Sequence, residues 1–111
     1  MEKLLSSGTA LCDAAGHGDQ SLVELLISHN VDVNSGKRNG ATPLHAASQE
    51  GHLEAVVALL QAGADPLLSR DDGALPIHKA ANNNHHEVVR ALIEQGRCSP
   101  DEVRTIVVKI H

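Results

Sequence analysis

The hydrophobic positions of this chain repeat three times at a spacing of 33 residues. The apolar blocks run from Leu22 to Ile27, from Ala55 to Leu60 and from Val88 to Ile93, and no insertion or deletion interrupts the register. Self-similarity at a fixed period of this length is typical of a solenoid, in which each unit covers the apolar face of its neighbour. The pattern therefore predicts a stack of three equivalent units.

Each unit is predicted to begin with a short helix. In the middle unit, Pro43 suits the first helical turn, where its missing N–H is no loss. Ala47 and Ser48 place a face of small side chains on this helix, which lets neighbouring helices approach closely. Gly51 then provides a left-handed C-terminal cap, and Asn84 takes the same position in the third unit.

A second helix and a hairpin complete the predicted unit. The helix spans about residues 53–62, with Val56, Leu59 and Leu60 on its buried stripe and Gly63 at its end. The turn dipeptides Asn39-Gly40 and Asp72-Gly73 lie 33 residues apart and are strong β-hairpin signals. The predicted order is helix, turn, helix, hairpin.

The segment from Thr42 to His52 reads Thr-Pro-Leu-His-Ala-Ala-Ser-Gln-Glu-Gly-His. It resembles the signature of the ankyrin repeat family, Thr-Pro-Leu-His-x-Ala-Ala-x-x-Gly-His. Departures are Ala10 and Cys12, where Pro and His are usual, and Leu75 in place of Thr. The resemblance implies an all-α ankyrin-repeat solenoid of three stacked helix-turn-helix units with β-hairpin fingers.

The 33-residue register sets the expected boundaries. An N-terminal extension occupies residues 1–8, and the three repeats occupy residues 9–41, 42–74 and 75–98. A C-terminal capping helix is predicted over residues 99–111, because Ser99 suits an N-cap and is followed by Pro100 and two acids. The alternative is a strand, since residues 105–108 are rich in β-branched side chains.

Composition narrows the class of protein. The chain is 41% hydrophobic but contains no Phe, Trp or Tyr, so its core is built from aliphatic side chains. Its net charge of −5 argues against nucleic acid as a partner, because phosphate binding calls for a basic face. No apolar run approaches the roughly 20 residues that cross a bilayer. We therefore expect a soluble cytoplasmic or nuclear protein that binds no membrane.

The eight histidines are predicted to be structural or solvated rather than metal ligands. His45 and His78 occupy the family's structural position, where the ring ties the turn between units. His52 and His85 lie one unit apart, which is roughly 10 Å for stacked helices. Zinc ligands lie near 2 Å from the metal, so no metal is expected at this pair. The sequence indicates no other cofactor either.

The sequence contains no recognisable catalytic arrangement. Cys12, Asp13 and His17 suggest a nucleophile with a base, but Cys12 falls in the inward-facing column of His45 and lacks an orienting group. Cys98 has nothing nearby that would lower its pKa. No phosphate loop or His-Glu-x-x-His motif is present. The chain is predicted not to be an enzyme.

One covalent modification is suggested by the family resemblance. Leu26 followed by Asp32-Val33-Asn34 resembles the segment that an asparaginyl hydroxylase modifies in many ankyrin repeats. Asn34 is therefore a candidate for hydroxylation. The alternative is a structural asparagine that closes the loop between two units.

The resemblance also implies where a partner protein would bind. In ankyrin proteins, hairpin tips and the outward side of the first helices form a concave surface, and loops on a rigid scaffold commonly carry recognition. On this chain the expected binding residues are Asp13, Lys37, Arg38, Asn39, Ala41, Gln49, Glu50, Ser69, Arg70, Asp71, Asp72, Ala74, Lys79, Asn82 and Asn83. Arg38 and Arg70 are the expected anchors.

The leading hypothesis is thus a non-catalytic interaction module or adaptor for a partner protein. The first alternative is an ankyrin fragment of a larger enzyme or signalling protein, in which it would position or inhibit another domain. An inhibitor that occupies a kinase or transcription factor is a special case of binding. We expect a monomer, with self-association through the apolar C-terminal end as the alternative.

Overall fold

The computed structural model describes residues 8–96, and these residues form helices and no strand. The helices are α2 (Gly8–His17), α3 (Gln20–Ser28), α4 (Pro43–Glu50), α5 (Leu53–Gln61), α6 (Pro76–Asn82) and α7 (His86–Glu94). None of these helices is long and apolar enough to cross a membrane. The predicted capping helix at 99–111 and the self-association surface there lie outside the described residues.

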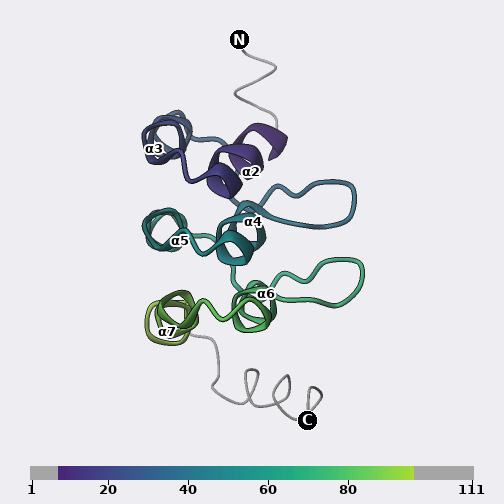
Figure 1. The fold of residues 1–111 in the computed structure, drawn as a ribbon. Helices are drawn as coiled ribbons and strands as arrows, with labels where there is room; N and C mark the ends of the chain where they lie inside the picture. The colour runs from purple at the N-terminus through teal and green to yellow at the C-terminus, as the bar shows by residue number, and fades with distance from the viewer. Residues whose placement is uncertain (1–7, 97–111) are drawn as a thin grey trace.

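The helices form two parallel columns, as Figure 1 shows. In one column α2 packs on α4 and α4 on α6; in the other α3 packs on α5 and α5 on α7. The layers of the stack are therefore α2 with α3, α4 with α5, and α6 with α7. Two loops project sideways from the column of first helices. The predicted stack of three helix-turn-helix units is confirmed.

The 33-residue register places equivalent side chains on one another in the core. All six members of two such columns are at most 2% exposed: Leu11, Leu44 and Ile77 from the first helices, and Leu26, Leu59 and Leu92 from the second. Burying a leucine or isoleucine side chain contributes roughly 1.5–3 kcal/mol. The aliphatic core predicted from the composition is therefore continuous through the described stack.

The predicted ends of the first helices are also confirmed. Thr42 is the N-cap of α4, and its Oγ1 accepts a hydrogen bond from the backbone N–H of His45 at 3.3 Å. At the other end Gly51 has φ 75°, a left-handed cap. Asn84, the matching residue of the next unit, has φ 61°. Only Gly and a few polar residues adopt this conformation readily.

The two projecting loops are called finger 1 (residues 36–41) and finger 2 (residues 69–74). In finger 1 the N–H of Gly40 donates to the carbonyl of Lys37 at 2.8 Å, and the N–H of Lys37 donates to Ala41 at 2.9 Å. Finger 2 repeats both bonds between equivalent residues. Gly40 has φ 82°, so each turn is built around a left-handed glycine.

The fingers confirm the predicted chain reversals but not a β-hairpin. Within residues 8–96 neither finger contains a strand. In finger 1 the turn is held by hydrogen bonds between residues of the same loop, including one from the N–H of Ala41 to Oδ1 of Asn39 at 3.0 Å. The adjacent tips are joined by the N–H of Asp71, which donates to the carbonyl of Asn39 at 2.9 Å. Each finger therefore supports its neighbour.

Ser48 is the one polar member of a column that otherwise contains Ala15 and Ala81. Its side chain is fully buried, and among the described residues its Oγ has no hydrogen-bond partner. Burying an unpaired hydroxyl is unfavourable, and alanine has the higher helix propensity.

Ser48→Ala is expected to raise the free energy of unfolding by about 1 kcal/mol, measured by urea denaturation. The reverse change at a fully buried matched site, Ala15→Ser, should lower it; a destabilising Ser48→Ala would contradict this interpretation.

Candidate partner-binding groove

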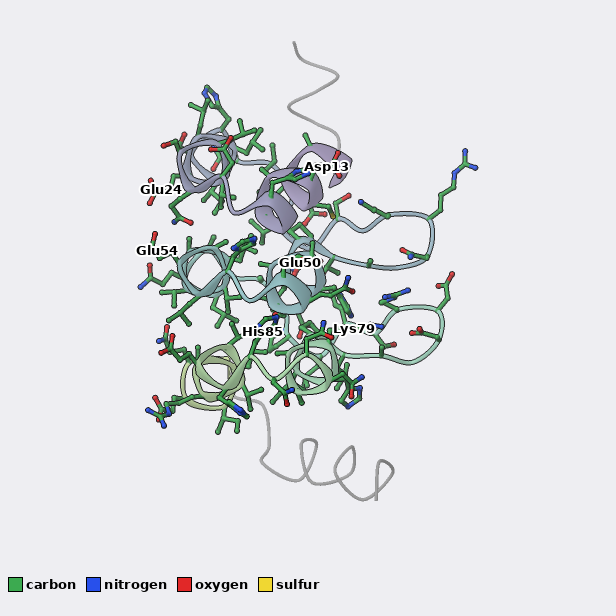
Figure 2. The ribbon with its side chains drawn as sticks, viewed as in Figure 1. Asp13, Glu24, Glu50, Glu54, Lys79 and His85 are labelled. Atoms are coloured by element: carbon green, nitrogen blue, oxygen red, sulfur yellow. The ribbon has the colours of Figure 1, made fainter. Side chains whose placement is uncertain are left out.

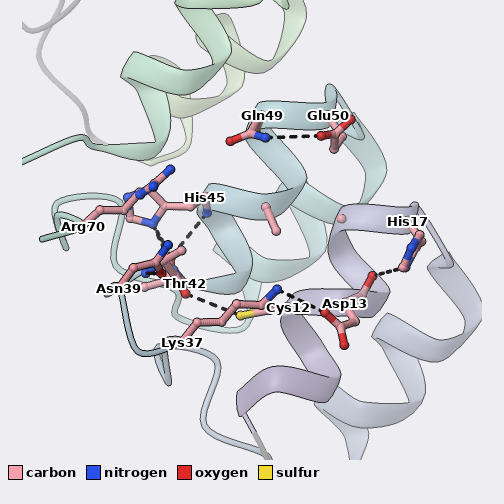
Figure 3. A pocket seen from close by; sticks show the side chains of 13 residues that line it. Cys12, Asp13, His17, Lys37, Asn39, Thr42, His45, Gln49, Glu50 and Arg70 are labelled. Carbon is pink, nitrogen blue, oxygen red and sulfur yellow. Dashed lines mark hydrogen bonds and ion pairs between the residues drawn. The ribbon is translucent and has the colours of Figure 1, made fainter. Parts of the chain in front are cut away.

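A groove of about 550 Å³ lies between the fingers and the column of first helices. Figure 3 shows it from close by. Its walls come from α2, α4 and both fingers, so segments far apart in the sequence meet there. It is lined by Cys12, Asp13, Gly16, His17, Lys37, Asn39, Ala41, Thr42, His45, Ala46, Gln49, Glu50 and Arg70. Below, this set is called the groove.

His45 joins α4 to finger 2 at the groove's floor. Its Nδ1 accepts a hydrogen bond from the backbone N–H of Thr42 at 3.1 Å. Its Nε2 lies 2.8 Å from the carbonyl oxygen of Ala74, which can only accept. These two partners fix the neutral ring with its proton on Nε2. The predicted structural role of His45 is confirmed, and finger 2 is held at a defined place above α4.

The pH dependence of folding follows from this arrangement. Burial lowers the pKa of His45 from its ordinary 6.5, and Arg70 and Lys79 lower it further against the opposing effects of the Ala74 carbonyl and Asp72. The unfolded chain therefore binds a proton more readily than the folded one. Stability from this residue is present above pH 6.5 and is lost as the pH falls below it.

The corresponding prediction compares stability at neutral and mildly acidic pH by urea denaturation. Wild-type protein is expected to lose stability as the pH falls below 6.5, and His45→Gln, which removes the titrating ring, should show a smaller loss. His86→Gln changes an exposed histidine and is the matched control. Equal pH slopes for wild type and His45→Gln would show that His45 does not carry the effect.

Cys12 takes the place of the structural histidine in the first unit. Its Sγ lies 3.6 Å from the carbonyl oxygen of Ala41, as His45 lies against that of Ala74. The side chain is 1% exposed, and burial raises the pKa of the thiol to about 11. The thiol is therefore protonated at neutral pH. His17 is bonded instead to the Asp13 carbonyl at 2.8 Å. The predicted burial of Cys12 is confirmed.

Charged side chains divide the groove into two walls. Lys37 and Arg70 come from the fingers, whereas Asp13 and Glu50 come from α2 and α4, where Figure 2 labels them. The Lys37 ammonium lies 3.2 Å from Oδ1 of Asp13, and both side chains are about half exposed. An exposed pair of this kind contributes little to stability. Its main consequence is that the Lys37 ammonium already has a carboxylate partner within the groove.

The structure brings only part of the predicted binding set into the groove. Asp13, Lys37, Asn39, Ala41, Gln49, Glu50 and Arg70 line it. The remaining predicted residues lie outside the lining: Arg38, Ser69, Asp71, Asp72, Ala74, Lys79, Asn82 and Asn83. Six lining residues were not predicted as binding residues, namely Cys12, Gly16, His17, Thr42, His45 and Ala46. The 33-residue spacing puts Cys12 and His45 in one column, and this is the sequence signal that could have indicated those two residues.

His52 and His85 connect successive units behind the groove. Nε2 of His52 lies 3.1 Å from the carbonyl oxygen of Gly16, and Nε2 of His85 lies 2.9 Å from that of Gln49. The amide of Asn83 donates to the same Gln49 oxygen at 3.0 Å. Each ring thus satisfies a carbonyl at the end of the preceding first helix. Of the two predicted alternatives for this pair, structural or solvated, the contacts correspond to the structural one.

Asn34 bridges the first and second units. Its Oδ1 accepts a hydrogen bond from the backbone N–H of Asp65 at 2.7 Å, and its own N–H donates to Oδ1 of Asp32 at 2.9 Å. These contacts are those expected of an asparagine that closes the loop between two units.

Comparisons with known proteins agree with the geometry. The family model described as "Ankyrin repeats (3 copies)" matches residues 2–70, and the one described as "Ankyrin repeat" matches residues 72–105. The human protein "Ankyrin repeat and SOCS box protein 14" is 38% identical over 50 residues, which is 45% of this chain and 8% of that protein.

Two further relatives come from other kinds of protein. "Protein phosphatase 1 regulatory subunit 12A" of Mus musculus is 48% identical over 50 residues, 45% of this chain and 5% of that protein. "Potassium channel SKOR" of Arabidopsis thaliana is 39% identical over 46 residues, 41% of this chain and 6% of that protein. The matched segment is therefore a small part of each relative's length.

Proposed function

The chain belongs to the ankyrin repeat family, and we propose that it is a non-catalytic interaction module or adaptor that binds a partner protein through its fingers and concave first-helix face. The groove carries this proposal, because it gathers polar groups from two units on a rigid stack. Repeat stacks generally use such concave surfaces for binding. We further propose that the protein acts as a monomer in the cytoplasm or nucleus, and that nucleic acid and membranes are not its partners.

The chemistry of the groove supports binding rather than catalysis. Its only thiol, Cys12, is protonated and engaged with a backbone carbonyl. Its buried histidine, His45, has both ring nitrogens engaged by the backbone. Nucleophilic catalysis needs an activated nucleophile within reach of a base. The groove residues instead offer hydrogen bonds and charges of both signs, which favour orientation and association rate in a protein complex.

The second candidate function is that of an ankyrin segment within a larger enzyme or signalling protein, where it positions or inhibits another domain. The lengths of the relatives favour it, since the matched segments cover 5 to 14% of those proteins. A full-length transcript that extends past His111 would support this alternative, and a stop codon at that point would exclude a C-terminal extension.

Hydroxylation of Asn34 remains a separate proposal. The Asn34 side chain bridges to Asp65 in the folded chain, so an enzyme that modifies it has to reach a loop held between two units. Expression with the asparaginyl hydroxylase, followed by mass spectrometry, tests the proposal. One added oxygen on Asn34 is the expected result, and an unmodified Asn34 peptide would dismiss it.

The test of the proposed function is an affinity pull-down with quantitative mass spectrometry. Arg38→Glu with Arg70→Glu reverses one positive charge on each finger, whereas Arg90→Glu reverses an exposed charge on α7 as the control. Proteins retained by the wild type and by the Arg90 variant should be lost from the finger variant. Circular dichroism establishes that all three are folded. Equal retention by the finger variant would show that the fingers are not the binding surface.

A further inference from the structure

Of the two basic side chains Lys37 and Arg70 in the groove, Arg70 has the longer distance to its carboxylate partner. Its side chain is 23% exposed, and its Nε is buried with no hydrogen-bond partner among the described residues. Its Nη2 lies 3.9 Å from Oδ2 of Asp72, beyond hydrogen-bond distance. Lys37, by contrast, is paired with Asp13 at 3.2 Å. The buried Nε cannot be reached from outside. Among the described residues no hydrogen bond engages the two Nη groups at the end of the partly exposed side chain, so these groups can take an acceptor from outside.

The position of Arg70 is fixed by the finger that carries it. Its backbone N–H donates to the Ala74 carbonyl at 2.9 Å, and its own carbonyl accepts from Gly73 at 2.8 Å. The Ala74 carbonyl also accepts the hydrogen bond from His45. Figure 3 shows the Arg70 side chain beside His45 at one end of the groove. Backbone hydrogen bonds therefore fix the main chain from which the Arg70 side chain enters the groove.

We propose that Arg70 is the anchor for an aspartate or glutamate side chain of the partner protein, received end-on by one N–H from each of its two Nη groups. This inference rests on the proposed function and names the chemistry recognised at that site. Arginine binds carboxylates with two parallel N–H bonds, which add geometric specificity to the charge attraction. The opposite wall, with Glu50, favours a basic residue farther along the same partner segment.

A phosphate group fits the groove less well than a carboxylate. Asp13 and Glu50 line the same groove, and Asp71 and Asp72 directly follow Arg70 in the chain. The chain also carries a net charge of −5. Since a phosphoserine has close to two negative charges, it would meet stronger repulsion from these acids than a singly charged carboxylate would. The charge distribution therefore selects the carboxylate.

The experiment selects binding peptides from a phage-displayed random library on wild-type protein and on Arg70→Gln. Peptides selected on the wild type should be enriched in Asp or Glu at one position, and those selected on Arg70→Gln should lose this enrichment. Arg90→Gln, a matched change on the exposed face of α7, should keep it. Equal acid enrichment on wild type and Arg70→Gln would overturn the assignment.

A wild-type-selected peptide is then titrated by fluorescence anisotropy. Changing its acid to the amide should weaken binding to the wild type about 10- to 100-fold and leave binding to Arg70→Gln nearly unchanged. Arg70→Lys keeps the charge but loses the fork, so it should recover only part of the affinity. Full recovery by lysine would refute the end-on contact through two N–H bonds, and tighter binding of a phosphoserine peptide would refute the carboxylate.

These outcomes separate this inference from the proposed function. Peptides that bind through the fingers without acid preference would refute the role of Arg70 and leave protein binding intact. Equal retention of cellular proteins by the finger variant in the pull-down would remove the proposed function itself.

Discussion

Replacing Leu59 with alanine is expected to lower the free energy of unfolding by about 2–5 kcal/mol. Leu59 is fully buried at the middle of the column that contains Leu26 and Leu92. The change removes apolar contact and leaves a cavity between two units that both depend on it. Three units are about the minimum for a stable stack, so the loss is expected to destabilise the whole described stack. Urea denaturation followed by circular dichroism measures it.

Leu67→Ala is the matched control for this prediction. Leu67 is 54% exposed, in the loop that leads to finger 2, and loses little buried surface on truncation. Its effect should stay within about 0.5 kcal/mol. If the two leucines gave similar losses, the stability of the protein would not reside in the stacked columns.

Replacing Gly51 with alanine is expected to lower the free energy of unfolding by about 2–3 kcal/mol. Gly51 has φ 75°, which alanine adopts unfavourably, and a methyl group there would lie 2.5 Å from Nδ1 of His85. The ring would have to move, and its 2.9 Å bond to the Gln49 carbonyl would be lost. The substitution thus combines backbone strain with a broken link between two units. Thermal and urea unfolding both report the loss.

Gly73→Ala separates these two contributions. Gly73 has φ 84°, but an added methyl group meets nothing within 4 Å. Its substitution should show the backbone strain alone, about 1–2 kcal/mol. In a His85→Ala background, Gly51→Ala should fall to the level of Gly73→Ala. An unchanged effect of Gly51→Ala in that background would exclude the clash with His85.

Most of the fold could be predicted from the sequence because the same pattern of apolar and turn residues occurs in three units. The register alone identifies Leu11, Leu44 and Ile77 as equivalent, and all three are fully buried. The cap at Gly51 follows from one residue type and one backbone conformation. The fingers could be predicted less well. Their turns are local, but the bond between the N–H of Asp71 and the Asn39 carbonyl depends on the spacing of two stacked units.

The groove could be predicted only in part for the same reason. Lys37 and Arg38 are adjacent basic residues at the same tip, yet only Lys37 lines the groove. Which of two neighbours faces inward depends on the turn geometry, and the dipeptide signal does not specify it. The unpaired Nε of Arg70 and the contact of Cys12 with the Ala41 carbonyl are likewise tertiary features. The sequence predicts which segments form the groove, whereas the structure shows which of their side chains line it.

A partner protein is expected to dock on the concave side of the stack. Backbone amide chemical-shift mapping of the labelled protein, with a partner identified in the pull-down, locates the docking surface residue by residue. The largest shifts are expected in finger 1, finger 2 and the C-terminal end of α4. Largest shifts on the exposed faces of α3, α5 and α7, with the fingers unperturbed, would contradict it.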